Sequence, residues 1–376
     1  MRKVFHLIPT VNIGGAETMV KDYALLLNKD LFDVKIVSID KSYHSVNEKE
    51  LEAASIPIVY LSELHYNPGT ELNLFQKIKK TIYRYVDLRR MLREECPDVL
   101  HVHLHVGKYL RFVPLKRWGI KTFYTVHNEL SHYFDKTGQN KKKYHEYLEI
   151  KRLVHTQGVT LIALQEKMKC DLQELFDTNQ VCVVNNGVKL SRFHRELYSQ
   201  GRIRIELGIK EDAYIVGHVG RFHEQKNHEF LIQVFYKMLQ VNNKCHLLLV
   251  GSGELRTQIE QKIEELAIGD SVTILQNRSD IPELMCAMDV FLFPSKWEGF
   301  GNVLIEAQSM GVPCVISDKV PKDTMINDNV RMLSLQESID TWANSALNMK
   351  IGVVRDNIRQ FDISNCVRIL ENLYCD

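Results

Sequence analysis

The feature that most constrains the fold is a regular alternation of short β-branched runs with amphipathic stretches of helix length. In the first half of the chain these runs predict strands at Val4–Pro9, Val34–Ile39, Ile58–Leu61, Val99–His103, Thr122–Val126, Thr160–Leu164 and Val181–Val184. Helices fit between them, for example at Glu17–Asn28, Leu72–Glu95 and Lys141–His155. Such βαβ alternation predicts a parallel sheet that helices cover on both faces.

The same rhythm restarts after Asn186-Gly187-Val188, where an Asn-Gly pair breaks a strand. The second set of predicted strands is Ile215–Val219, His246–Val250, Val272–Leu275, Val290–Phe293 and Pro313–Ile316, with helices at His228–Gln240, Glu254–Leu266 and Val303–Met310. We therefore expect an α/β protein with two doubly wound, Rossmann-like domains, at residues 1–186 and 187–361. A C-terminal helix at Asp362–Tyr374, within residues 362–376, could pack back on the first domain or on the second.

Several common catalytic and binding motifs are absent from the sequence, and this narrows the classes of function that remain. There is no Walker-type phosphate loop, no GxGxxG after the first strand, no DxD or HExxH metal signature and no GxSxG elbow. No apolar run reaches the roughly 18 residues that span a bilayer, and the N-terminal run ends too early for a signal peptide. The eight cysteines form no CxxC pair, so we expect a reduced, cytoplasmic protein.

The strongest local motif is FPSKWEGFGNVLIE, from Phe293 to Glu306. After a buried strand and a glycine-rich loop, the backbone N–H groups of residues 300–303, which include Phe300, Gly301 and Asn302, would form an anion site at a helix start. Glu298 would lie at the strand's carboxyl end, and Glu306 one helical turn in, where a carboxylate can accept hydrogen bonds from the vicinal hydroxyls of a ribose. Read alone, the two acids could also be a solvated loop residue and a first-turn glutamate that the helix dipole favours.

A second motif, GHVGRFHEQKN, places two cations after another predicted strand. Arg221 and Lys226 would stand at the carboxyl edge of the second sheet, beside the helix start that follows Gly301. Two cations at that edge can neutralise a diphosphate leaving group without a metal. Taken alone, they could be ordinary loop cations.

Paired glycines follow two other strands, as Gly14-Gly15 and as Gly251-Ser252-Gly253. Glycine pairs let the backbone approach a ligand closely at a helix start, although they could serve only the turn.

His101 and His103 alternate along the predicted strand Val99–His103, and they would share one face with His105. A metal site is a weaker interpretation, because no nearby cysteine or carboxylate completes a ligand set, so core or hydrogen-bonding roles are favoured for His101 and His103. His127 follows the strand Thr122–Val126 at its carboxyl end, where ligand contacts cluster, and both a core and a ligand role stay open for it.

Taken in order, these motifs resemble the retaining glycosyltransferases of family 4. Those enzymes have the GT-B fold, in which two Rossmann-like domains face each other across a cleft. The resemblance spans nearly the whole chain: the GGAE loop at Gly14, the Asn186-Gly187 linker, Gly220-Arg221 with a downstream lysine, the GSGE turn, and Glu298 to Glu306 with its EAQSMGVP continuation. The closest similarity is to bacterial enzymes of cell-surface polysaccharide synthesis.

The resemblance implies roles at the diphosphate of a nucleotide-sugar donor. Gly14 and Gly15 would line the diphosphate, while Arg221 and Lys226 would stabilise the leaving nucleoside diphosphate. No metal and no cofactor would then be required, because the two cations do the work of a metal ion.

It also implies contacts to the rest of the donor. Glu306 would hold the ribose, Glu298 the transferred sugar near its C3 hydroxyl, and His127 that sugar near C6. The loop Gln276–Ile281, which contains Arg278, would flank the base. The pair Gly301-Asn302 departs from many relatives, which leaves the identity of the sugar open.

The implied reaction is retaining transfer of a hexose or N-acetylhexosamine, from a UDP-linked sugar to a saccharide on a polyprenyl-diphosphate carrier. The alternatives are a sugar-nucleotide 2-epimerase of the same fold and a non-catalytic nucleotide-sugar-binding protein. The net charge is only +1, and the basic stretch lacks an aromatic platform pattern, so no nucleic-acid partner is expected. Residues 77–152 nevertheless carry a net charge of +10. Peripheral attachment to the anionic inner face of the cell membrane is therefore expected.

Overall fold

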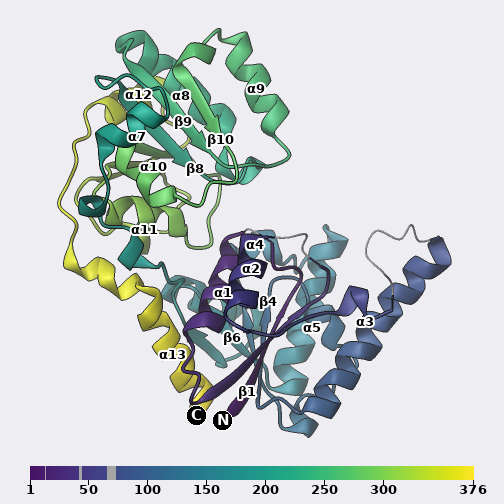
Figure 1. The fold of residues 1–376 in the computed structure, drawn as a ribbon. Helices are drawn as coiled ribbons and strands as arrows, with labels where there is room; N and C mark the ends of the chain where they lie inside the picture. Colours follow the sequence, from purple (N-terminus) through teal and green to yellow (C-terminus); the bar gives the residue numbers. More distant parts are fainter. Residues whose placement is uncertain (13, 42–44, 66–72) are drawn as a thin grey trace. The chain divides into compact units, whose positions relative to one another are not determined.

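In the computed structural model the chain divides into two compact units. The described residues are 1–376 apart from 13, 42–44 and 66–72. Unit 1 comprises Met1–Gly187 with Ile363–Asp376, and unit 2 comprises Val188–Asp362 (Figure 1). The expected boundary, between 186 and 187, lies one residue from the observed one.

The described part of unit 1 contains a seven-stranded parallel sheet in the order β3-β2-β1-β4-β5-β6-β7. Its strands are β1 (Arg2–Ile8), β2 (Phe32–Ser38), β3 (Ile58–Tyr60), β4 (Val99–His103), β5 (Lys121–Thr125), β6 (Thr160–Ala163) and β7 (Val181–Val183). From β1 the sheet extends to one side through β2 and β3, and from β4 it extends to the other side through β5, β6 and β7. The switch between these two strands is the place where doubly wound sheets bind ligands.

The helices of unit 1 are α1 (Gly15–Leu26), α2 (Val46–Ala53), α3 (Leu74–Glu95), α4 (Leu130–Tyr133), α5 (Lys141–Gln157), α6 (Glu166–Phe176) and α13 (Ile363–Cys375). Short 3-10 helices are η1 (Leu61–Glu63), η2 (Gly107–Leu110) and η3 (Lys116–Trp118). Asn73 caps α3 in a reciprocal pair with Gln76, which fixes the start of that helix at Leu74. The predicted start at Leu72 lies outside the described residues.

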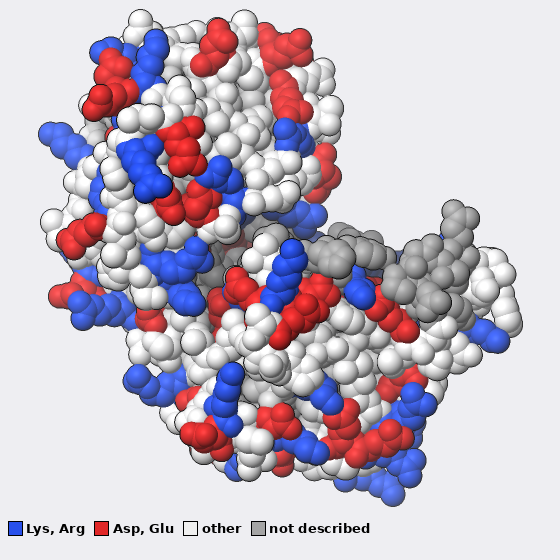
Figure 2. Space-filling view, viewed as in Figure 1, with Lys and Arg blue, Asp and Glu red and all other residues white. Residues whose placement is uncertain are grey.

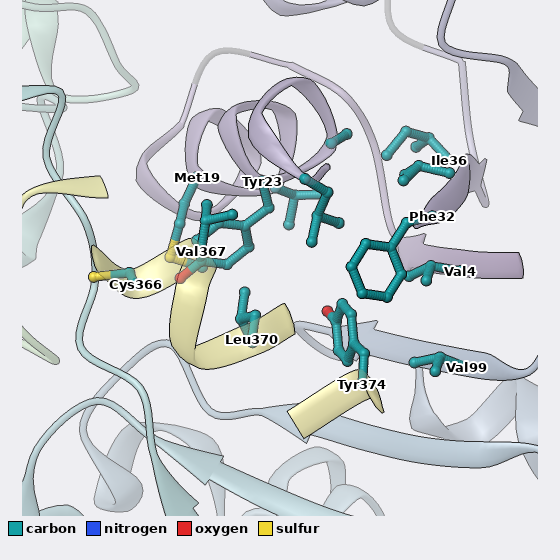
Figure 3. Close-up of a cluster of buried hydrophobic side chains, with 14 of the residues drawn as sticks. Val4, Met19, Tyr23, Phe32, Ile36, Val99, Cys366, Val367, Leu370 and Tyr374 are labelled. Carbon is teal, nitrogen blue, oxygen red and sulfur yellow. The ribbon is translucent and has the colours of Figure 1, made fainter. Parts of the chain in front are cut away.

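The C-terminal helix α13 packs on unit 1 and completes its core. Tyr374 and Leu370 lie among Phe32, Val4 and Val99 beneath α1, as Figure 3 shows. The chain enters the helix past Gly187, where a Cβ atom would lie 2.6 Å from the Cα of Ile363. Only glycine fits so close an approach of two backbone segments.

The structure describes every residue of unit 2, whose six strands form a parallel sheet in the order β10-β9-β8-β11-β12-β13. The strands are β8 (Tyr214–Val219), β9 (Cys245–Val250), β10 (Val272–Leu275), β11 (Val290–Phe293), β12 (Cys314–Ser317) and β13 (Val330–Leu333). Here the direction switches between β8 and β11. The two sheets have the parallel, doubly wound architecture expected from the sequence.

Helices of unit 2 are α7 (Gln200–Glu206), α8 (His228–Val241), α9 (Arg256–Glu265), α10 (Ile281–Ala287), α11 (Asn302–Ser309) and α12 (Ile339–Leu347). Its 3-10 helices are η4 (Leu190–Arg192), η5 (Arg195–Leu197), η6 (Glu224–Lys226), η7 (Gly269–Ser271), η8 (Lys322–Thr324) and η9 (Asp356–Phe361). Among the described residues of both units, no helix is long and apolar enough to cross a membrane.

Candidate active site

The loops that follow β8, β9 and β11 meet at the switch point of unit 2. β8 pairs with both β9 and β11, so the carboxyl ends of these strands are neighbours. The loop after β8 carries Arg221 and Lys226, and the loop after β11 carries Glu298. The backbone N–H of Lys296 donates to the carbonyl of Gln225 at 2.8 Å, which ties the two loops together.

Lys226 and Glu298 form a largely buried ion pair. The Nζ of Lys226 lies 2.6 Å from Oε1 of Glu298, and the two side chains are 15 % and 6 % exposed. The amide of Gln225 donates to the other carboxylate oxygen at 3.3 Å. The ammonium also lies 4.7 Å from the ring centroid of Phe293, close enough for a cation–π contact. Both oxygens of Glu298 are therefore held by donors from the loop after β8.

Arg221 differs from Lys226 in being exposed. Its side chain is 70 % exposed, and its guanidinium lies 3.3 Å from the carboxylate of Glu254, itself 51 % exposed. The backbone N–H of Glu254 is the main cause, and Arg221 a further cause, of a lowered pKa for that carboxyl. An exposed pair of this kind is weak and is easily exchanged for another anion.

The GSGE turn positions the loop that carries Arg221. A Cβ at Gly251 would lie 1.9 Å from the carbonyl oxygen of Gly220, so a side chain is excluded there. The N–H of Phe222 donates to the carbonyl of Ser252 at 2.8 Å and joins the two loops. These glycines let two loops touch, which is the turn role that the sequence left open beside a ligand role.

A buried histidine lies under the same loop. The Nδ1 of His218 donates to the carbonyl of Leu292 at 2.8 Å, so in the neutral ring Nε2 is an unprotonated acceptor. Burial holds the pKa of this imidazole well below its usual range. A Cβ at Gly220 would lie 3.0 Å from His218 Nε2 and 3.2 Å from Cε of Lys226, so the lysine stem passes through a crowded space.

The start of α11 brings the remaining predicted residues to this edge. Gly301 caps the helix with φ 89°, a left-handed conformation that favours glycine. Asn302 is the first helical residue, and its buried Oδ1 has no hydrogen-bond partner in the described chain. Glu306 lies half-buried in the second turn. Phe300 is only 2 % exposed and its ring packs on Phe361, so the ring is not available to a ligand.

Arg278 follows β10, the edge strand of the sheet. Its guanidinium pairs with both carboxylate oxygens of Asp280, and Glu206 lies 3.6 Å away. The Arg278 side chain lowers the pKa of Asp280. The guanidinium is thus held by acidic neighbours in this structure, and its predicted place beside the base stays a prediction.

In unit 1 the predicted glycines lie at the start of α1. Gly14 is the N-cap, and a Cβ there would lie 2.3 Å from a carboxylate oxygen of Glu17, whereas a Cβ at Gly15 would meet no atom within 4 Å. Ser45 donates to the carbonyl of Val11 at 2.6 Å and holds the preceding loop. The helix start at Gly15 therefore borders open space. Ile13, part of the same motif, lies outside the described residues.

His127 lies beyond β5, at the carboxyl edge of the sheet of unit 1. Its Nε2 lies 3.1 Å from Nδ1 of His103, and its own Nδ1 is buried with no partner among the described residues. Burial lowers the pKa of His127 to about 3, so the ring is neutral at physiological pH. His101 and His103 are fully buried and hydrogen-bonded, in agreement with the expected core or hydrogen-bonding role.

Sequence reasoning missed several contributors to these sites. Gln225 holds the second oxygen of Glu298, Phe293 underlies the lysine, and Glu254 pairs with Arg221. The position of Gln225, next to the predicted Lys226, was the one available signal for it. Nothing in the sequence indicates that Phe293 would be approached by a cation from a loop more than sixty residues earlier.

Two doubly wound parallel sheets, with cations, carboxylates and a helix start at the switch point of the second, are the architecture of the GT-B fold. Residues 13–192 match the family model described as Glycosyltransferase Family 4, and residues 199–348 match the model described as Glycosyl transferases group 1. The chain belongs to glycosyltransferase family 4.

Individual relatives agree with this membership. The chain is 29 % identical to the Bacillus subtilis protein EpsF, named as a glycosyltransferase, over 99 % of its own length and 96 % of the relative's. It is 24 % identical to the Escherichia coli UDP-Gal:alpha-D-GlcNAc-diphosphoundecaprenol alpha-1,3-galactosyltransferase over 79 % and 80 %. It is 23 % identical to the capsular polysaccharide biosynthesis glycosyltransferase CapH of Staphylococcus aureus over 100 % and 99 %.

The fold has solved counterparts. The crystal structure of Anabaena HepE in complex with UDP-glucose superposes with a TM-score of 0.75, covering 100 % of both chains at 19 % sequence identity. At that identity the likeness establishes the GT-B fold.

Proposed function

We propose that this protein transfers a hexose or N-acetylhexosamine from a UDP-linked sugar, with retention of configuration, to a saccharide on a polyprenyl-diphosphate carrier. The observation that carries the proposal is the buried Lys226–Glu298 pair beside the start of α11, at the switch point of unit 2. The galactosyltransferase relative is named for a UDP-Gal donor and a diphosphoundecaprenol-linked acceptor, and CapH for capsular polysaccharide biosynthesis. These names support a role in cell-surface polysaccharide synthesis.

In this proposal unit 2 binds the donor. The carboxylate of Glu306 accepts hydrogen bonds from the ribose hydroxyls, and the backbone N–H groups at Gly301 and Asn302 contact the anionic part of the donor. The orphaned Oδ1 of Asn302 is a further acceptor that a ligand can satisfy. Arg278, near the base, has to leave or share Asp280 to reach a ligand.

Charge on the leaving diphosphate is stabilised by Arg221 and Lys226. Transfer through an oxocarbenium-like transition state concentrates negative charge on the leaving nucleoside diphosphate, and preorganised cations lower the energy of that state. Lys226 is held in place by Glu298, whereas the exposed Arg221 is free to exchange Glu254 for phosphate. The two cations together take the role of a metal, so no metal ion is required.

Retention is best explained by attack on the same face that the diphosphate leaves. A carboxylate that acts as a nucleophile needs an oxygen free to attack the anomeric carbon. In Glu298, Oε1 is bound to Lys226 and Oε2 to Gln225, an arrangement suited to orienting the sugar through its C3 hydroxyl.

Unit 1 is assigned to the acceptor, with contacts to the donor from Gly14, Gly15 and His127. The open space at Gly15 leaves the first turn of α1 accessible to an anion such as the diphosphate. The unpartnered Nδ1 of His127 can pair with a hydroxyl of the transferred sugar near C6.

The membrane is the proposed source of the acceptor, and α3 is the surface proposed to contact it. The apolar side chains of this helix fall into two groups in the structure. Toward its C-terminus, Leu88 and Leu92 are fully buried. The large apolar side chains that precede them, Leu74, Phe75, Ile78, Ile82 and Val86, are all more than half exposed.

Basic residues accompany the exposed part of α3. Lys77 and Lys79 are exposed, and the ammonium of Lys79 lies 5.1 Å from the ring centroid of Phe75. Figure 2 shows Lys and Arg side chains along the edge of unit 1 where α3 runs. Apolar residues flanked by lysines fit the headgroup region of an anionic bilayer, where each basic residue contributes up to about 1 kcal/mol. On this basis we propose that the enzyme attaches to the inner face of the cell membrane.

Vesicle co-sedimentation tests the membrane surface. We expect binding to vesicles with anionic lipid, lost at high salt, and weakened at least ten-fold by the double substitution Phe75→Ser and Ile78→Ser. Because these side chains are exposed, the variant keeps its fold. Ile205→Ser, an exposed apolar residue of unit 2, is the matched control and leaves binding unchanged. Equal binding to neutral and anionic vesicles would contradict the proposal.

Incubation with a panel of UDP-sugars, with and without a lipid-linked saccharide, tests the reaction. Mass spectrometry should detect UDP and an extended lipid-linked product only when the acceptor is present. An epimerised sugar nucleotide would identify the 2-epimerase instead, and binding without any product would identify a non-catalytic protein.

A further inference from the structure

A row of three histidines crosses the sheet of unit 1 at its switch point. His6 lies in β1, His103 is the last residue of β4, and His127 lies two residues beyond β5. The Nδ1 of His6 lies 3.0 Å from Nε2 of His103, and Nδ1 of His103 lies 3.1 Å from Nε2 of His127. Each ring uses one nitrogen for each neighbour, so the row is a continuous hydrogen-bonded chain.

Both ends of this histidine chain are open. Nε2 of His6 and Nδ1 of His127 are buried, and neither has a hydrogen-bond partner among the described residues. The outer nitrogen lies at the carboxyl edge of the sheet, where ligands of such folds bind. A buried polar atom without a partner is costly unless a ligand or water satisfies it.

All three rings are neutral, and this couples the proton position of each ring to that of its neighbour. Burial lowers the pKa of His6 and of His127 to about 3 each, and that of His103 well below its usual range. A neutral imidazole has one N–H and one bare nitrogen. If His6 donates from Nδ1, His103 accepts at Nε2 and donates from Nδ1, and His127 in turn carries its proton on Nδ1. If the direction is reversed, all three rings carry the proton on Nε2.

We propose that His6 and His103 are positioning residues that fix the tautomer and ring orientation of His127. The proton then sits on the same nitrogen type in all three rings, so the tautomer of His6, two hydrogen bonds away, is tied to whether His127 Nδ1 donates or accepts. The ligand that this nitrogen takes is a hydroxyl, which can pair with either direction. The inference rests on the proposed function for its effect on turnover, because there the hydroxyl belongs to the donor sugar.

His101 is the matched control for the chain. It is as buried as His103 and lies on the same strand, but its nitrogens bond to the hydroxyls of Tyr374 and Thr125. His6, His101 and His103 also have nitrogens within 4.8 Å of one another, close enough for a metal ion to bridge them. Metal binding would require His101 to give up one of these hydroxyl bonds, so it is an outcome that the test has to exclude.

Nitrogen NMR of the full-length protein, labelled with ¹⁵N at histidine, reads the tautomers directly. Protonated and bare ring nitrogens have well-separated shifts, and single substitutions assign the three rings. We expect His6, His103 and His127 to show one common tautomer, unchanged by EDTA. Mixed tautomers, a charged ring at neutral pH, or shifts that change on addition of Zn²⁺ alone would overturn the inference.

Single substitutions test whether the tautomer of His127 depends on His103. In His103→Phe the signals of His127 should move to a mixture of tautomers, whereas His101→Phe should leave them unchanged. An unchanged His127 tautomer in His103→Phe would contradict the coupling.

Turnover separates this inference from the proposed function. With the best donor among UDP-glucose, UDP-galactose and UDP-N-acetylglucosamine, we expect His103→Phe to lower kcat about 10–100-fold, as is typical when the partner that orients a functional histidine is lost, and His101→Phe to lower it less than two-fold. If His127→Ala lowers kcat but His103→Phe does not, the positioning role is wrong. If neither does, the proposed donor contact fails, and the NMR result alone decides the tautomer chain.

Discussion

The Lys226–Glu298 pair gives the sharpest prediction of stability, because both charges are largely removed from water. At 2.6 Å the gross attraction is on the order of 6 kcal/mol with an effective dielectric constant of ~20. Desolvation offsets most of it, but removal of one partner leaves the other charge buried and unpaired, which typically costs ~3–5 kcal/mol. Lys226→Met keeps the aliphatic stem over Phe293, so we expect the free energy of unfolding to fall by about 3 kcal/mol, near the lower end because the lysine is 15 % exposed.

Arg221→Met is the matched control for this prediction. Arg221 and Glu254 are 70 % and 51 % exposed, so loss of their pair should change the free energy of unfolding by less than ~0.5 kcal/mol. Both variants should still lower turnover by ~10²-fold or more, because each removes a cation from the leaving diphosphate. The free energy of unfolding therefore distinguishes Lys226 from Arg221, whereas turnover does not.

Urea unfolding followed by tryptophan fluorescence, to which Trp342 in the core of unit 2 contributes, measures this quantity. Addition of Glu298→Gln to Lys226→Met should recover at least ~1 kcal/mol relative to the sum of the single changes, since neither charge is then left unpaired. The reasoning would be refuted if Lys226→Met were no less stable than Arg221→Met.

Three further predictions concern Glu306, the two cations Arg221 and Lys226, and Glu146. Glu306→Ala should weaken UDP binding in calorimetry at least ten-fold without lowering the melting temperature, and unchanged affinity would contradict the ribose assignment. Transfer activity should persist in excess EDTA, and loss of activity that Mg²⁺ restores would contradict the metal-independent role of Arg221 and Lys226. Burial raises the pKa of Glu146 from 4.5 to about 7, so its protonated form stabilises unit 1 below pH 4.5, and this contribution is lost as pH rises through 7. Glu146→Gln should therefore gain stability relative to the wild type between pH 5 and pH 8 in thermal unfolding, and a constant difference across that range would show that the carboxyl does not titrate there.

The strands that lie inside the sheets were predictable, since their runs of valine, isoleucine and leucine are buried on both faces. β13 (Val330–Leu333) was missed because it is an edge strand in which Arg331 is exposed and breaks the apolar run. The cap at Asn73, which fixes the start of α3 at Leu74, was not recognised in the sequence.

The sequence motifs predicted which residues lie at the site, but not which side chains contact one another. Loop positions after strands placed Arg221, Lys226 and Glu298 at one edge of the sheet. The ion pair between Lys226 and Glu298 joins residues 72 apart, and no local pattern encodes it. The histidine chain likewise draws on two strands and the loop after β5, and its bonds depend on the register of β1 against β4.

The stereochemistry of the product tests the central claim most directly. The wild-type protein is incubated with its best UDP-sugar and a polyprenyl-diphosphate-linked saccharide, and proton NMR determines the anomeric configuration of the new linkage. With Glu298 held by Lys226 and Gln225, and the diphosphate leaving beside the two cations, we predict the configuration of the donor sugar, formed without added metal. An inverted linkage, or no linkage with any UDP-sugar, would contradict this account.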